Sequence, residues 1–153
     1  MKKYIPNAVT CCNLISGCIA TLFALKGDFA TATAFIVAGA VFDFLDGMTA
    51  RLLGVSSPIG KELDSLADVI TFGFAPSAMA FTFLSQHFVC GEECDIASLI
   101  PYTAFIMAAF SALRLAKFNL DERQAMGFIG LPTPANALFW TSFIITAEKI
   151  AIP

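Results

Sequence analysis

Long uncharged runs constrain this chain more than any other feature of its sequence. Four runs approach the length of a membrane-spanning helix, which is roughly 20 apolar residues. These runs are residues 4–25, 69–91, 96–113 and 124–147. A fifth run, 29–42, reaches that length only if its helix continues past two aspartates to about Ala50. The sequence therefore predicts an all-α fold, a polytopic transmembrane helical bundle with five spans.

Composition and the placement of charge agree with a membrane protein. Hydrophobic residues make up 58% of the chain and charged residues 14%, against about 25% charged in ordinary soluble domains. This excludes a disordered chain and a basic nucleic-acid-binding protein, so we expect no nucleic acid partner. With the N-terminus inside, the positive-inside rule places seven basic residues on the cytoplasmic side of the inner membrane. They are Lys2, Lys3, Arg51, Lys61, Arg114, Lys117 and Arg123.

The few charged residues crowd into one segment. Seven of the 21 lie within residues 43–68, "DFLDGMTARLLGVSSPIGKELDSLAD". Asp43 and Asp46 share one face of a helix with Ala50, and Asp64 and Asp68 share a face with Gly60. A turn at residues 54–58 makes the two helices antiparallel neighbours. Four carboxylates are then expected to converge near the cytoplasmic surface of the membrane.

Such a convergence needs positive charge. One charged side chain in the bilayer core costs roughly 3 kcal/mol on insertion scales, and like charges in one pocket repel each other. Oxygen ligands select hard divalent cations, so we predict two Mg²⁺ or Mn²⁺ ions held by the four aspartates. Two such ions can clamp a phosphate. Gly47, Ala50 and Gly60 leave room for a large polar group, Arg51 suits a phosphate, and Ser57 offers a hydroxyl.

The segment resembles the signature of the CDP-alcohol phosphatidyltransferase family, D-x-x-D-G-x-x-A-R-x8-G-x3-D-x3-D, at every fixed position. The resemblance implies a membrane enzyme that moves a phosphatidyl group from a CDP-linked lipid to an alcohol and releases CMP. It implies that Asp43, Asp46, Asp64 and Asp68 bind two divalent cations and that Asp68 is also the base. Contacts to the substrate are implied for Asn7, Thr10, Gly47, Ala50, Arg51, Ser57 and Gly60.

Flanking strings narrow the resemblance. "GKELDSLADVITFGFAPS", "SALRLAKFN" and "FIGLPTPA" are similar to bacterial and archaeal phosphatidylserine synthases of this family. They imply CDP-diacylglycerol and L-serine as substrates, with Arg114 as a further substrate-binding residue, and a homodimer. We therefore treat residues 1–153 as a single transmembrane domain. The family usually has six spans, so either the last span is absent or the chain is a fragment.

Three alternatives stay open at this point. An acceptor such as glycerol 3-phosphate or inositol phosphate would keep the chemistry and change the alcohol. A divalent-cation transporter would use the aspartates as its pathway, but its acidic groups should be spread across the membrane. A non-catalytic assembly subunit would not need the full signature.

The cysteines carry a separate set of predictions. Those of the first span, Cys11, Cys12 and Cys18, are expected to be small packing residues. Cys90 and Cys94 can form a local disulfide if their side of the membrane is oxidising.

Overall fold

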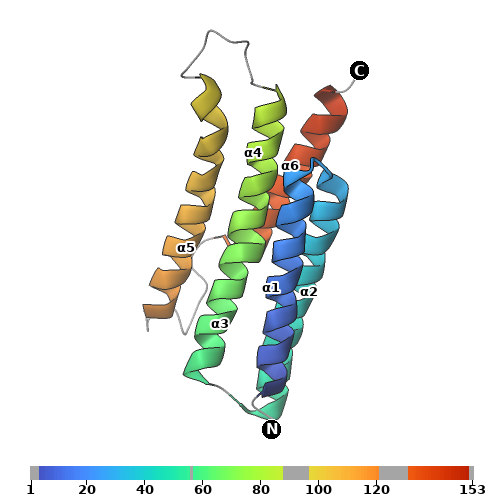
Figure 1. The fold of residues 1–153 in the computed structure, drawn as a ribbon. Coiled ribbons are helices and arrows are strands. Elements are labelled where there is room, and N and C mark those ends of the chain that lie inside the picture. The colour runs from blue at the N-terminus through green and yellow to red at the C-terminus, as the bar shows by residue number, and fades with distance from the viewer. Residues whose placement is uncertain (1–3, 56, 88–96, 121–130, 152–153) are drawn as a thin grey trace.

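The chain folds into an all-helical bundle, seen in a computed structural model that describes residues 4–55, 57–87, 97–120 and 131–151. Successive helices run up and down the bundle, and α1 begins at the end opposite to the one where α6 finishes (Figure 1). The described residues contain no strand. The prediction of an all-α bundle is confirmed.

Helices α1 (Tyr4–Leu25) and α2 (Phe29–Leu53) form a closely packed hairpin. Gly27 makes the turn possible, because its φ of 80° lies in the left-handed region that glycine adopts without strain. Asp28 then caps α2 by accepting a hydrogen bond from the Thr31 backbone N–H at 3.0 Å. Hydrogen bonds from the Thr31 side chain and backbone lower the pKa of Asp28 below its ordinary 3.8. Both predicted spans are confirmed, and α2 extends three residues beyond Ala50.

The turn after α2 uses local signals that the sequence displays. Gly54 ends α2 in a left-handed conformation, with φ 61° and ψ 30°. Ser57 caps α3 (Pro58–Asp68), its Oγ accepting a hydrogen bond from the Gly60 N–H at 3.0 Å, and Pro58 occupies the first turn. Helix α3 packs against α1, whereas its direct contact with α2 is slight within the described residues.

Helix α3 does not stop where the charged segment ends. It continues through a π-helical turn, η1 (Val69–Phe74), into α4 (Ala75–His87), so that one 30-residue helix runs from Pro58 to His87. The predicted start of this span at residue 69 is therefore wrong. Lys61 and Glu62 are exposed, so the helix keeps these charges without burying them.

The last helices complete the bundle. A 3₁₀ segment, η2 (Ala97–Ala104), leads into α5 (Phe105–Leu120), and α6 (Thr133–Ala151) follows. Four helices are long and apolar enough to cross a membrane among the described residues: Tyr4–Leu25, Phe29–Leu53, Pro58–His87 and Ser98–Leu120. The fifth predicted span, 124–147, is helical from Thr133, but α6 is not among these four. Cys90, Cys94 and Arg123 lie outside the described residues.

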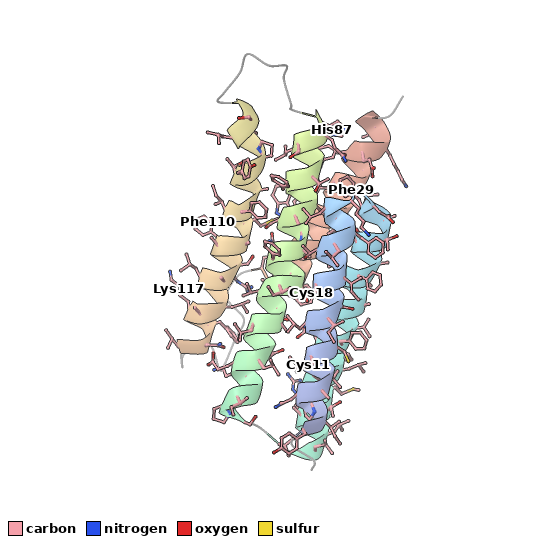
Figure 2. All side chains as sticks on the ribbon, viewed as in Figure 1. Cys11, Cys18, Phe29, His87, Phe110 and Lys117 are labelled. Atoms are coloured by element: carbon pink, nitrogen blue, oxygen red, sulfur yellow. The ribbon has the colours of Figure 1, made fainter. Side chains whose placement is uncertain are left out.

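Small residues bring the helices together in the core. Thr71, fully buried in the π turn, occupies a position where a Cβ atom on Gly17 of α1 or Gly39 of α2 would collide with it. Close backbone approach through small residues is the usual way that membrane helices pack. Phe29, Phe72 and Met79 are buried among these helices, whereas other large apolar side chains, such as Phe110, face outward (Figure 2). Cys11, Cys12 and Cys18 are exposed on α1, so their prediction as packing residues is wrong.

Candidate active site

Three carboxylates meet between α2 and α3. One oxygen from each of Asp43, Asp64 and Asp68 lies within 4.8 Å of the other two. Asp68 is buried, and Asp64 Oδ1 is buried without a hydrogen-bond partner. Like charges at this separation repel each other, and an unpartnered buried oxygen is costly. The donor set, all carboxylate oxygen, fits a hard divalent cation, which would satisfy the orphaned oxygen and offset the repulsion.

The fourth predicted ligand, Asp46, is held differently. It is buried, and its Oδ2 accepts a hydrogen bond from Thr10 Oγ1 at 2.6 Å, which ties α2 to α1. Asp46 does not belong to the group of three, although all four aspartates line the same large cavity. The structure therefore brings the four carboxylates to one site and gives Asp46 a distinct partner.

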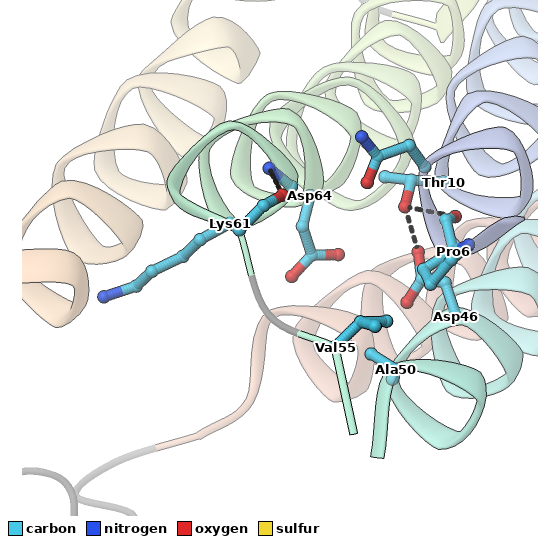
Figure 3. A pocket seen from close by; sticks show the side chains of 11 residues that line it. Pro6, Thr10, Asp46, Ala50, Val55, Lys61 and Asp64 are labelled. Carbon is cyan, nitrogen blue, oxygen red and sulfur yellow. Dashed lines mark hydrogen bonds between the residues drawn. The ribbon is translucent and has the colours of Figure 1, made fainter. Parts of the chain in front are cut away.

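A small cavity of about 320 Å³ opens beside the carboxylates (Figure 3). Its volume falls at the lower end of the range typical of small-molecule sites. Six of the eight predicted substrate-binding residues line it: Asn7, Thr10, Gly47, Ala50, Ser57 and Gly60. They come from α1, from the end of α2 and from the start of α3. The turn between α2 and α3 thus closes a pocket whose wall was predicted from the sequence.

The two glycines of the cavity wall differ in the space around them. A Cβ atom on Gly47 would meet nothing within 4 Å, because this residue faces open cavity. A Cβ atom on Gly60 would lie 3.0 Å from both Asn7 Oδ1 and Ser57 Oγ. Gly60 therefore allows the cap of α3 and α1 to approach, while Gly47 keeps the cavity itself clear.

A larger cavity of about 810 Å³ adjoins the carboxylates on the side of α5 and α6. The other two predicted substrate-binding residues, Arg51 and Arg114, line it. Arg114 Nη1 donates a hydrogen bond to Thr133 Oγ1 at 3.1 Å, which joins α5 to α6. Apolar side chains, among them Phe44, Met48 and Leu115, make up part of the wall. The cavity therefore presents guanidinium groups and an apolar surface together.

Among the residues at the site that were not predicted are two buried polar side chains and one lysine. Asn13 is fully buried and donates from Nδ2 to Asp68 Oδ1 at 3.2 Å, and Thr71 Oγ1 donates to the Asn13 backbone carbonyl at 3.1 Å. Lys61 lines both cavities. The available signal was an asparagine in an apolar helix, one turn after Thr10 and on the same face.

Comparison with known proteins identifies a family and several similar proteins. The family model described as CDP-alcohol phosphatidyltransferase matches residues 3–152. The chain is 36% identical over 136 residues to a CDP-diacylglycerol–serine O-phosphatidyltransferase of Bacillus subtilis, covering 86% of this chain and 70% of that protein. Relatives with the same name come from Helicobacter pylori (35% identical, 94% of this chain) and Methanocaldococcus jannaschii (36% identical, 91%). The chain spans only 58% and 59% of those two proteins.

Proposed function

The chain belongs to the CDP-alcohol phosphatidyltransferase family, and from this premise we propose that it transfers the phosphatidyl group of CDP-diacylglycerol to the hydroxyl of L-serine. The four long apolar helices and the family make it an integral membrane protein. In this proposal residues 1–153 act as one transmembrane domain. The names of the curated relatives support serine as the acceptor.

One observation carries the proposal. The three clustered carboxylates of Asp43, Asp64 and Asp68 stand beside a cavity that is lined by the small residues of the same motif. A cytidine nucleotide needs a concave site with a few polar groups, and its pyrophosphate needs positive charge at one end. The cavity can hold the nucleotide, and the carboxylates can bind the cations that would supply this positive charge.

Divalent cations are expected at the carboxylates. Asp43, Asp64 and Asp68 would hold one ion, and Asp46, which lines the same cavity, would contribute to a second. When bound, the ions would supply positive charge that neutralises the phosphate oxygens. We propose Mg²⁺ or Mn²⁺, because both prefer oxygen ligands.

The side chains have separate roles in the proposed reaction. Asn7, Thr10, Gly47, Ala50, Ser57 and Gly60 would surround the nucleotide in the small cavity. Asp68 would accept the proton of the serine hydroxyl while the serine oxygen forms a bond to the phosphorus that carries diacylglycerol. The bond from that phosphorus to the CMP phosphate oxygen breaks, and CMP leaves. Positioning of the two substrates would account for much of the catalysis.

The large cavity suits the acceptor and the lipid. Arg114 would pair with the serine carboxylate, and Arg51 would bind phosphate. The apolar side chains Phe44, Met48 and Leu115 would contact the glycerol and acyl part of the lipid. In this division the nucleotide would lie in the small cavity and the acceptor in the large one, with Asp46 and Asp64 bordering both.

We propose that the protein lies in the inner membrane and that its site is at the cytoplasmic end of the bundle. Helix α2 ends, α3 begins and α5 ends at one end of the bundle (Figure 1). Arg51, Lys61 and Lys117 lie in these segments, whereas Lys26 lies in the turn at the other end. The positive-inside rule then assigns the first end to the cytoplasm. The homodimer implied by the family remains a prediction, which cross-linking in membranes would test.

The test is CMP release by the purified protein supplied with CDP-diacylglycerol and Mn²⁺ or Mg²⁺. Serine, glycerol 3-phosphate and inositol phosphate are offered separately, and Asp68→Asn serves as the matched inactive variant. Of the three acceptors, only serine is expected to support CMP release. Release only with a phosphorylated acceptor would replace serine, and cation flux in proteoliposomes without any CMP release would favour a transporter.

A further inference from the structure

Asn13 is a fully buried amide in the middle of a membrane helix. Its Nδ2 donates a hydrogen bond to Asp68 Oδ1 at 3.2 Å. Its own carbonyl oxygen, Oδ1, is buried and has no hydrogen-bond partner. An unsatisfied buried acceptor lowers stability. The amide is therefore poorly explained by the stability of the fold.

The orientation of the amide follows from its neighbours. Reversing it would set its carbonyl oxygen against the carboxylate of Asp68, and two acceptors repel each other at hydrogen-bond distance. In the observed orientation Oδ1 lies toward α2, where a Cβ atom on Gly39 would come within 2.9 Å of it. Gly39 thus leaves the space that the amide needs in order to present its N–H to Asp68.

The backbone of Asn13 is fixed by the same helix that carries Asp68. Thr71 Oγ1 donates to the Asn13 carbonyl at 3.1 Å, and Thr71 is fully buried. Asp68 and Thr71 flank the start of the π turn, a feature often found at functional sites. Asn13 of α1 therefore donates one hydrogen bond to Asp68 and accepts another from Thr71, and the two bonds hold the segment in which α3 ends.

We infer that Asn13 is a positioning residue for Asp68. Its N–H donates to Asp68 Oδ1 and fixes the rotation of the carboxylate, and in this inference the proton of the attacking hydroxyl passes to the other carboxylate oxygen, Oδ2. The O–H bond of the alcohol breaks, an O–H bond forms on Oδ2, and the alcohol oxygen is free to bond to phosphorus. The inference rests on the proposed function, since it assumes Asp68 as the base.

Two substitutions of Asn13 test the inference. Asn13→Leu keeps the branching of the side chain without its polar atoms, and Asn13→Asp keeps its size while replacing the donor by an oxygen. A hydrogen bond to a charged group is worth enough to expect a fall in kcat of about 10- to 100-fold for each variant. The KM for CDP-diacylglycerol should stay within about threefold, because Asn13 does not line the small cavity.

Stability provides the readout that separates positioning from packing. In Asn13→Leu, loss of the donor to Asp68 and removal of the orphaned oxygen act in opposite directions, so the apparent Tm should stay within about 4 °C. Thr21→Val is the matched control, because Thr21 is buried on the same helix and its hydroxyl bonds only to the Gly17 carbonyl among the described residues. This control should keep its kcat.

Each result decides the matter. An unchanged kcat in either variant overturns the inference. A parallel fall of kcat and Tm, or failure of both variants to fold, makes Asn13 a packing residue and overturns it as well. Absence of serine-dependent CMP release from the unaltered protein, measured first, identifies failure of the proposed function instead.

Discussion

Replacing Gly47 by alanine is expected to separate the stability of the fold from the activity of the site. Gly47 lies on α2 and borders both cavities, and a Cβ atom there would meet no heavy atom within 4 Å. Within a helix, the change from glycine to alanine is worth about 0.5–1 kcal/mol of stability. The apparent Tm of Gly47→Ala should therefore rise by roughly 1–4 °C.

The same methyl group should weaken substrate binding. It enters a cavity of about 320 Å³ that, in the proposed function, must hold a cytidine nucleotide. An extra methyl group in a filled site costs about 1–3 kcal/mol, which corresponds to about 5- to 150-fold in affinity. We expect the KM for CDP-diacylglycerol to rise by a factor in that range.

The assay measures CMP release against CDP-diacylglycerol concentration, together with thermal unfolding in the same detergent. Ala34→Gly is the matched control, because Ala34 is exposed on α2 well away from the cavity. It makes the opposite change in helix propensity and should lower the Tm without changing the KM. A Gly47→Ala variant with a raised Tm and an unchanged KM would refute the placement of the nucleotide in this cavity.

Three further predictions concern the carboxylates and the helix caps. Asp64→Asn should raise the Mn²⁺ concentration for half-maximal CMP release by at least about 10-fold, since even outer partners of metal ligands are worth that much; an unchanged Mn²⁺ requirement would remove Asp64 from the ligand set. Ser57→Ala should lower the apparent Tm by about 2–4 °C through loss of the α3 cap, whereas Ser57→Asp should keep the Tm but raise the KM for the anionic lipid. Because hydrogen bonds from Thr31 lower the pKa of Asp28, its contribution is present above pH 3.8 and lost as the pH falls through the folded-state pKa. Lowering the pH from about 6 to about 3 should therefore reduce the apparent Tm of the wild type more than that of Asp28→Asn. Equal losses of Tm would exclude this cap as the acid-sensitive group.

The sequence predicted which carboxylates lie together, because the signals that place them are local. The aspartates are spaced by helical periods on two helices, and a glycine and a proline mark the turn between them. These rules place Asp43, Asp64 and Asp68 at the same end of the bundle before any tertiary contact is known. Gly47, Ala50, Ser57 and Gly60 of the small cavity belong to the same segment, whereas Asn7 and Thr10 on α1 were implied only by the family resemblance.

The residues that were missed depend on how the helices meet. Asn13 stands out in the sequence only as a polar interruption of an apolar helix, and its partner is 55 residues away. Thr71 lies within the π turn, which shifts the helical phase, so a 3.6-residue period does not predict that it faces α1. The exposure of Cys11 and Cys18 also depends on how the helices meet. Gly17, and not these cysteines, lies on the packed face of α1.

The two ends of α3 explain why a packed core and an open site can share one helix. At its start, α3 follows the turn at Gly54, and the small cavity lies between this part of α3 and the end of α2. At its end, the π turn places Thr71 against Gly17 and Gly39, where no further side-chain atom fits. Asp68 lies at the boundary, with its carboxylate in the large cavity and its backbone next to the packed turn. A base that must meet a mobile alcohol at a fixed angle benefits from such a position, because the packed side limits its movement and the open side admits the substrate.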